Sequence, residues 1–241
     1  MLPRTLAGAT LIAALLALAA AAFAVLAPPS DSDLFWSLAS GEWMLGHARV
    51  LDHDVFSFTR AGAGYSTGQW LGEIVLALAF RAGGWLGIAL LRAALIALAT
   101  FFALRALLRV QPHAGWAAVP AAALILETRA IWGDRPQLFS LALFALVLDL
   151  LLATRADGRA RRLWLLPPLV AVWANLHGGF AAGLALIAVF AVEAVLVDER
   201  RIARVRRGAS APAFWRARFA RGSRAPVRRD RRGHAGAISP P

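Results

Sequence analysis

The sequence predicts an all-α protein, a polytopic transmembrane helix bundle of about six spans whose long outer first loop carries interfacial helices. Of its 241 residues, 59% are hydrophobic and 17% are charged, which is far more apolar than an ordinary soluble domain. Residues 5–27 contain no charge, and this run can cross a bilayer core of about 30 Å at about 1.5 Å per residue. Cysteine is absent, so the chain has no disulfide and no thiolate metal site.

The apolar stretches divide the chain into four parts. Residues 1–27 are interpreted as an uncleaved signal-anchor helix, because the apolar run exceeds the ~7–15 residues of a signal-peptide core. Residues 28–83 form the outer loop, with acidic and aromatic motifs and interfacial helices. We expect a transmembrane helix bundle over residues 84–199 and an Arg-rich, disordered tail over 200–241. The apolar stretches after the anchor are 70–82, 84–109, 115–127, 136–154, 163–176 and 178–198.

The first of these stretches differs from the others. It is short for a span and carries Glu73 and Arg81, so we expect an interfacial or partly inserted helix there. The pair Gly83 and Gly84 separates it from the next stretch.

The arginines indicate which side of the membrane each loop faces. With the amino terminus in the cytoplasm, the tail and seven further arginines fall inside (Arg4, Arg105, Arg109, Arg155, Arg159, Arg161 and Arg162). Five fall outside (Arg49, Arg60, Arg81, Arg129 and Arg135), as the positive-inside rule requires. This topology also puts three polar segments outside, at 28–70, 127–137 and 173–179. We expect them to converge on that face.

The tail at 200–241 holds the whole net charge of +12. It contains 13 arginines and one acid, whereas residues 1–199 contain 13 of each. Three interpretations remain open. The tail is a cytoplasmic segment that binds anionic lipid headgroups, a nucleic-acid arm, or an out-of-frame translation of GC-rich codons. We favour the third, which would make the chain a fragment, and we expect no nucleic-acid partner because no binding module accompanies the tail.

The outer loop opens with two candidate acids. Asp31 and Asp33 stand directly before an apolar run, and Asp33 is placed to cap a helix over 34–46. Capping by one carboxylate leaves the other available for chemistry. Trp36 lies on this expected helix and suits a position at the headgroup level.

Other candidates follow at intervals along the chain. Asp54 ends an Asp-His-Asp run that fits a divalent cation weakly, and a turn is the simpler interpretation. Trp70 and Glu73 stand one helical turn apart and are expected to face the same direction.

The two later polar segments each carry a candidate. Arg135 at the outer start of a span either anchors it, paired with Asp134 or lipid phosphate, or holds a substrate phosphate. Asn175 and His177 lie near the outer end of another span, where polar groups are costly enough to be functional candidates. No phosphate-binding loop, dinucleotide fingerprint, Gly-x-Ser-x-Gly elbow or zinc helix is present.

Six motifs stand in order along residues 1–199: DLFWSLASGEWML at 33–45, DHDVFSFT at 52–59, QWLGE at 69–73, GGWLGIALLR at 83–92, RPQLFS at 135–140 and WANLHGGF at 173–180. In these motifs the chain resembles a group of large bacterial polytopic proteins related to the C-type glycosyltransferase superfamily, which includes protein O-mannosyltransferases and oligosaccharyltransferases. The resemblance ends where the tail begins. It departs from the group's pattern at Ser37, where a histidine often stands, and at Gly68 and Gln69, where a His-Glu pair is common.

The resemblance implies a fold, a place and a reaction. It implies a multi-pass protein of the bacterial inner (cytoplasmic) membrane, with a cytoplasmic amino terminus and with membrane lipids and a lipid-linked sugar donor as partners. Such enzymes move a sugar from a polyprenyl-phosphate donor to an acceptor at the outer face. An acid of the first loop activates the acceptor, and a cation steadies the leaving phosphate.

Carried onto this chain, Asp33 is the expected acidic residue whose carboxylate removes the acceptor proton, with Asp31 or Asp54 as a second carboxylate or as the ligand of a divalent metal ion. The substrate and phosphate contacts are then expected from Arg135, His177, Asn175, Trp36, Trp70 and Glu73. The alternative is a non-catalytic membrane protein that binds lipid or a partner, or an inactive truncated fragment.

Overall fold

A computed structural model describes residues 2–26, 31–110 and 133–209, with side chains for these except at 2–7, 9 and 198–209. The expected span at 115–127 and most of the tail lie outside the described residues. The described residues form helices and loops, with one isolated bridge between His53 and Gly64 and no strand, which confirms the all-α prediction. The chain divides into two compact units, Met1–Ala191 and Val192–Pro241.

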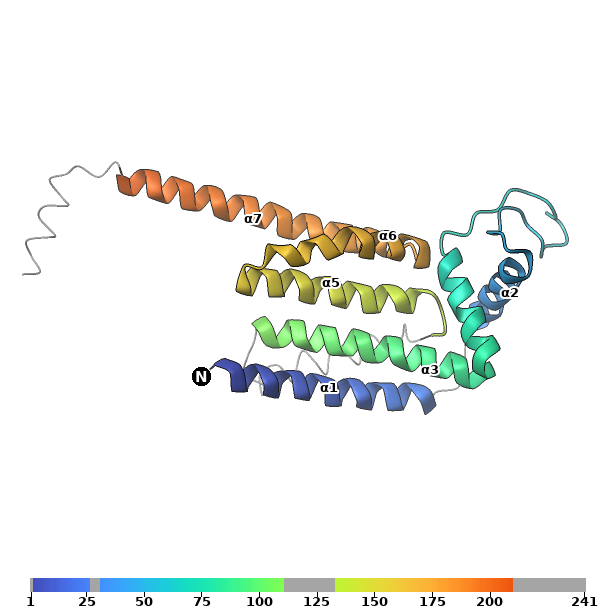
Figure 1. Cartoon of the computed structure of the whole chain (residues 1–241). Coiled ribbons are helices and arrows are strands. Elements are labelled where there is room, and N and C mark those ends of the chain that lie inside the picture. The colour runs from blue at the N-terminus through green and yellow to red at the C-terminus, as the bar shows by residue number, and fades with distance from the viewer. Residues whose placement is uncertain (1, 27–30, 111–132, 210–241) are drawn as a thin grey trace, which may run out of the picture. The chain divides into compact units, whose positions relative to one another are not determined.

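Three helices pack side by side in the first unit (Figure 1): α1 (Leu2–Leu26), the longer part of α3 (Trp70–Val110) and α5 (Gln137–Asp157). α1 buries small side chains at intervals of three or four residues, which places them on one face of the helix. Small residues let helix backbones approach closely, as in membrane helix pairs. The buried residues of this face are Ala13, Ala17, Ala20 and Ala24.

α3 bends sharply at the predicted glycine pair. Gly83 and Gly84 depart from helical geometry, and Gly84 has φ +56° and ψ −138°, a conformation that side chains with a Cβ rarely adopt. The part of α3 before the bend packs against α2 (Ser32–His47) through Leu34, Leu38 and Leu76. The bend therefore separates the stretch expected at 70–82 from the long helix that follows.

α6 is shorter than the sequence suggested. We expected a span at 163–176, but the structure has a 3₁₀ helix, η2 (Ala160–Leu165), followed by an α-helix of 11 residues, Leu166–Leu176. Pro167 and Pro168 have no N–H to donate, so they suit the first turn of an α-helix and not its interior. At about 1.5 Å per residue, α6 alone is too short to cross a bilayer core.

Three of the described helices are long and apolar enough to cross a membrane: Trp70–Val110, Gln137–Asp157 and Phe180–Val197, the last being part of α7 (Phe180–Ala209). The stretch Thr10–Leu26 of α1 is also apolar. These lengths and compositions are those of a helical membrane protein.

Candidate functional site

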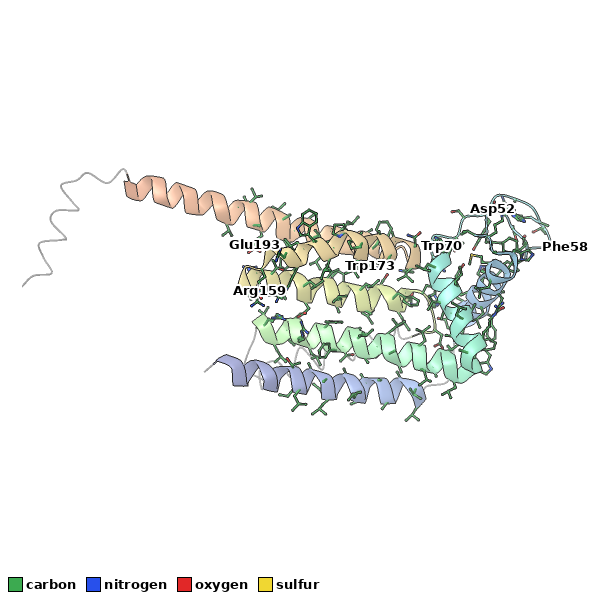
Figure 2. All side chains as sticks on the ribbon, in the orientation of Figure 1. Asp52, Phe58, Trp70, Arg159, Trp173 and Glu193 are labelled. Carbon is green, nitrogen blue, oxygen red and sulfur yellow. The ribbon has the colours of Figure 1, made fainter. Side chains whose placement is uncertain are left out.

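Segments that are far apart in the sequence meet at one end of the first unit, which we call the Asp31 end. It comprises α2, the loop at 48–69, the part of α3 before the bend, residues 133–140 and residues 175–179. Arg135 contacts Asp31, and Trp70 Nε1 donates a hydrogen bond to Asn175 Oδ1 over 2.8 Å. The described parts of the three polar segments thus converge as the sequence predicted, while 127–132 lie outside the described residues. Figure 2 labels Trp70 where α3 begins.

Asp31 caps α2. Its Oδ1 accepts the backbone N–H of Asp33 over 3.0 Å, and the helix begins at Ser32. The sequence favoured Asp33 as the cap, and this prediction was wrong. The cap is Asp31, two residues earlier, because the helix starts before the apolar run. The hydrogen bond from Arg135 holds the pKa of the Asp31 carboxyl below its usual value, and the bond from the backbone of Asp33 acts in the same direction.

Asp33 and Asp31 share the guanidinium of Arg135. Arg135 Nε contacts Asp31 Oδ2, and Arg135 Nη1 lies 3.1 Å from Asp33 Oδ2. The Asp31 side chain is 10% exposed, whereas that of Asp33 is 62% exposed. The cluster therefore holds two carboxylates on one cation, with one carboxylate buried and the other open to the surroundings.

Arg135 was expected to pair with Asp134 or with lipid phosphate, and the first of these partners is wrong. Asp134 points into the bundle, where Arg92 Nη1 contacts both of its carboxylate oxygens at 3.0 and 2.8 Å. The same guanidinium donates from Nη2 to the carbonyl oxygen of Ala24 over 2.9 Å. This buried pair joins the end of α1, the helix α3 and the segment before α5, and so fixes the backbone that carries Arg135.

The start of α3 fits closely against residues 136 and 176. A Cβ added at Gly72 would lie 2.6 Å from the carbonyl oxygen of Leu176 and 3.1 Å from Pro136 Cβ. Glycine is therefore required there for steric reasons. The close approach brings Trp70, two residues earlier at the helix start, within hydrogen-bonding distance of Asn175.

Glu73 lies on the inner side of α3. Its carboxylate is 1% exposed and accepts hydrogen bonds from Thr67 Oγ1 over 3.0 Å and from Gln69 Nε2 over 3.4 Å. These contacts tie the end of the loop to the first turn of α3. Because its oxygens bond within the same segment and not toward the surface, Glu73 holds the local backbone of the Asp31 end.

His177 ends a chain of hydrogen bonds that fixes its tautomer. The backbone N–H of Gly179 donates to His177 Nδ1 over 3.0 Å, so Nδ1 carries no proton. Trp173 Nε1 donates to Ser140 Oγ over 2.7 Å, and the Ser140 hydroxyl in turn donates to Nδ1 over 2.8 Å. The neutral ring therefore carries its proton on Nε2. Burial lowers the pKa of His177, because it disfavours the charged imidazolium.

Asp54 organises a turn. Its Oδ1 accepts the backbone N–H groups of Phe56 and Ser57 at 3.0 and 2.9 Å, and its Oδ2 accepts the Ser57 hydroxyl at 2.5 Å. These bonds, the one from the Ser57 hydroxyl above all, keep the pKa of Asp54 below its usual value. The contacts correspond to the turn that the sequence offered as the simpler interpretation.

A divalent metal ion does not fit these donors. The Asp31 carboxylate contacts a guanidinium, and both oxygens of Asp54 are engaged by the turn. Among the residues that the structure describes, no three histidine or acidic side chains lie close enough together to hold a metal ion.

The aromatic residue Trp36 faces the loop. Its Nε1 donates to the hydroxyl of Tyr65 over 3.3 Å, and its ring meets Phe56 edge to face at 5.2 Å. Side chains from α2 and from both arms of the loop therefore form one aromatic group, and its Trp36 stands three residues after Asp33 in α2.

Sequence reasoning missed three residues that this end uses: Tyr65, Thr67 and Ser140. A lone hydroxyl in a loop or on an apolar helix gives no signal in a single sequence, although Tyr65 is the only tyrosine of the chain. Ser37 is 2% exposed and does not reach the surface.

The class that the fold and this end define is a helical membrane protein with an acidic and aromatic cluster at one end of its bundle. Comparisons with known family models, with curated proteins and with solved structures return no match.

Proposed function

We propose that the chain is a membrane glycosyltransferase-like protein that moves a sugar from a polyprenyl-phosphate donor to an acceptor at the outer membrane face. One observation carries the proposal: the exposed carboxylate of Asp33 is held by Arg135 at the start of α2, at one end of an apolar helix bundle. The named donor class comes from the family resemblance of the six motifs.

The reaction assigns Asp33 the role of general base. The acceptor hydroxyl loses its proton to the Asp33 carboxylate as its oxygen bonds to the anomeric carbon. The bond from that carbon to the phosphate oxygen breaks, and the phosphate leaves with the electron pair. Asp33 suits this role better than Asp31, since its side chain is 62% exposed and Asp31 is already engaged as a helix cap.

Two donors are available to the leaving phosphate. His177 presents an N–H at Nε2, because its Nδ1 is occupied by Ser140 and Gly179. Arg135 uses Nε and Nη1 for the two aspartates, and its remaining nitrogen is Nη2. Trp36, Trp70 and Asn175 then line the donor side, and Glu73 supports the backbone. No step requires a metal ion.

We further propose that the amino terminus is cytoplasmic and that the membrane is the bacterial inner membrane. The distribution of charge supports this orientation. The Asp31 end holds most of the acids in the described part of the first unit, and the opposite end is rich in arginine (Arg105, Arg109, Arg155, Arg159, Arg161 and Arg162).

A second candidate is non-catalytic binding of lipid or of a partner protein. The observation in its favour is that Arg135 already contacts two carboxylates, which leaves less of its positive charge for a substrate phosphate. A binding protein needs no free base, and replacement of Asp33 would then leave no enzymatic activity to lose.

The two candidates differ in a transfer assay. Membranes that contain the chain are incubated with a labelled polyprenyl-phosphate sugar, and the label in the acceptor fraction is measured for the wild type and for Asp33→Asn. The matched control is Asp52→Asn, another exposed loop carboxylate that pairs with an arginine, Arg49. Loss of a general base lowers the rate by about 10²–10⁴-fold.

We expect transfer by the wild type and by Asp52→Asn, and none above background for Asp33→Asn. Absence of transfer by the wild type, or equal rates for the two variants, would rule out the catalytic role and favour binding.

A further inference from the structure

The opposite end of the first unit carries a second charge cluster, which we call the Asp149 end. It comprises the last turns of α3, the last turns of α5, and η2. Asp149, 1% exposed at its side chain, accepts from Arg105 Nη2 over 2.6 Å and from Arg109 Nε over 2.8 Å. The two arginines are one turn apart on α3, so both guanidinium groups reach the same carboxylate on α5.

The trio of Arg105, Arg109 and Asp149 has one positive charge in excess. Two guanidinium groups, which stay charged at any physiological pH, face a single carboxylate. The other acid of the first unit's described residues at this end is Asp157, and it pairs with Arg159 and Arg162. No described acid of residues 2–191 is therefore left at this end to neutralise the pair on Asp149.

The excess charge lies at the edge of an apolar bundle. Arg105 is 32% exposed and Arg109 is 24% exposed, whereas Asp149 is enclosed. The Arg105 guanidinium also lies over the rings of Phe101 and Phe102, at 5.4 and 5.6 Å. Within the described residues of the first unit, no second carboxylate contacts Arg105 or Arg109. An uncompensated charge is costly beside hydrocarbon, so an anion of single charge is favoured at this edge.

We propose that Arg105 and Arg109 bind the phosphodiester group of an anionic phospholipid such as phosphatidylglycerol. The group carries one negative charge, which matches the excess, and guanidinium N–H groups suit phosphate oxygens. A lipid fits better than free phosphate, because η2, which packs against α5, exposes Leu163, Trp164 and Leu165 at the same end. Exposed tryptophan and leucine are typical of the lipid headgroup level.

The lipid site does not depend on sugar transfer, since it uses none of the residues of the Asp31 end. It is tested with the full chain in detergent micelles, titrated with phosphatidylglycerol or with phosphatidylcholine. Bound lipid is counted by native mass spectrometry, which reports on the folded protein alone. We expect phosphatidylglycerol to bind at least fivefold more tightly than phosphatidylcholine, because one arginine near a membrane surface contributes about that factor.

Variants locate the site. Arg109→Gln removes one charge but leaves Asp149 paired with Arg105, and we expect an approximately fivefold loss of phosphatidylglycerol affinity. The matched control is Arg81→Gln, an arginine of the same helix that pairs with Glu42 at the Asp31 end, and it should bind as the wild type does. Arg105→Gln provides a second variant of the site.

Three outcomes would overturn the proposal. They are equal affinity for the two lipids, wild-type affinity in both Arg109→Gln and Arg105→Gln, and competition by inorganic phosphate at the same concentration as the lipid. The last would assign the site to a soluble anion.

Discussion

Each end of the first unit holds a cluster of three charged side chains, and the two clusters have opposite ratios of acidic to basic groups. At the Asp31 end, Asp31 and Asp33 share the guanidinium of Arg135. At the Asp149 end, Arg105 and Arg109 share one carboxylate. The clusters stand about 20 Å apart along α5 at about 1.5 Å per residue. The Asp31–Asp33–Arg135 cluster therefore has one carboxylate in excess, and the Arg105–Arg109–Asp149 cluster has one guanidinium in excess.

The difference in burial decides what each excess charge can do. In the Asp31–Asp33–Arg135 cluster the most exposed group is an acid, Asp33, which can accept a proton from a substrate. At the Asp149 end the acid is enclosed and the arginines are the exposed groups, which can bind an anion but cannot act as bases. We infer that the chemistry belongs to the first end and lipid binding to the second.

The largest predicted effect is at the shared carboxylate. Asp149→Asn leaves two guanidinium groups without a counter-charge at an enclosed position. Removing one member of a buried pair costs about 3–5 kcal/mol, and we expect about 3 kcal/mol because the arginines keep part of their solvent contact. The free energy of unfolding in detergent measures the change.

The control for that experiment is Asp157→Asn, which also removes a carboxylate shared by two arginines, but an exposed one. Exposed ion pairs contribute little, so its effect should be clearly smaller. Equal effects would show that burial does not distinguish the two carboxylates.

A smaller effect is expected from the cap of α2. Asp31→Ala and Asp31→Asn both remove the charge that faces Arg135, but asparagine keeps an oxygen for the backbone N–H of Asp33. The alanine variant should therefore be less stable than the asparagine variant by about 1 kcal/mol. Thermal unfolding of the two variants measures this difference, and identical stability would show that Asp31 acts through its charge alone.

Lowering the pH should destabilise the protein through the Asp31 end, because all histidines of the described residues (His47, His53 and His177) lie there. The pKa of His177 is lowered by burial from its ordinary 6.5. As the pH falls below that value, the unfolded chain takes up a proton that the folded chain refuses, so stability decreases down to the folded pKa.

We therefore expect wild-type protein to lose more stability between pH 7.5 and pH 5.5 than His177→Gln does. The midpoint of thermal unfolding at the two pH values is the measurement. Parallel decreases in both proteins would show that His177 does not have a lowered pKa.

The sequence predicted the convergence at the Asp31 end for a simple physical reason. Helices that cross a bilayer return their loops to alternate sides, so apolar run lengths alone assign 28–70, 127–137 and 173–179 to one face. The glycine pair at 83–84 was likewise visible as a break. These features depend on local composition and on spacing along the chain.

The partners within the site could not be predicted in the same way. Asp134 is the neighbour of Arg135 in sequence, yet Arg92 pairs with Asp134, and Asp31 and Asp33 pair with Arg135. Which side of a turn each side chain takes depends on the packing of α1, α3 and α5. The tautomer of His177 depends in the same way on Ser140, 37 residues away.

The most direct test of this account is the side of the membrane that each end faces. The chain has no cysteine, so single cysteines can be introduced by Phe58→Cys, at a fully exposed loop position, and by Arg161→Cys, at an exposed position of η2. Intact cells are treated with a membrane-impermeant maleimide. We predict that only the Phe58→Cys protein is labelled before the membrane is opened, whereas labelling of Arg161→Cys alone, or of both variants, would contradict the account.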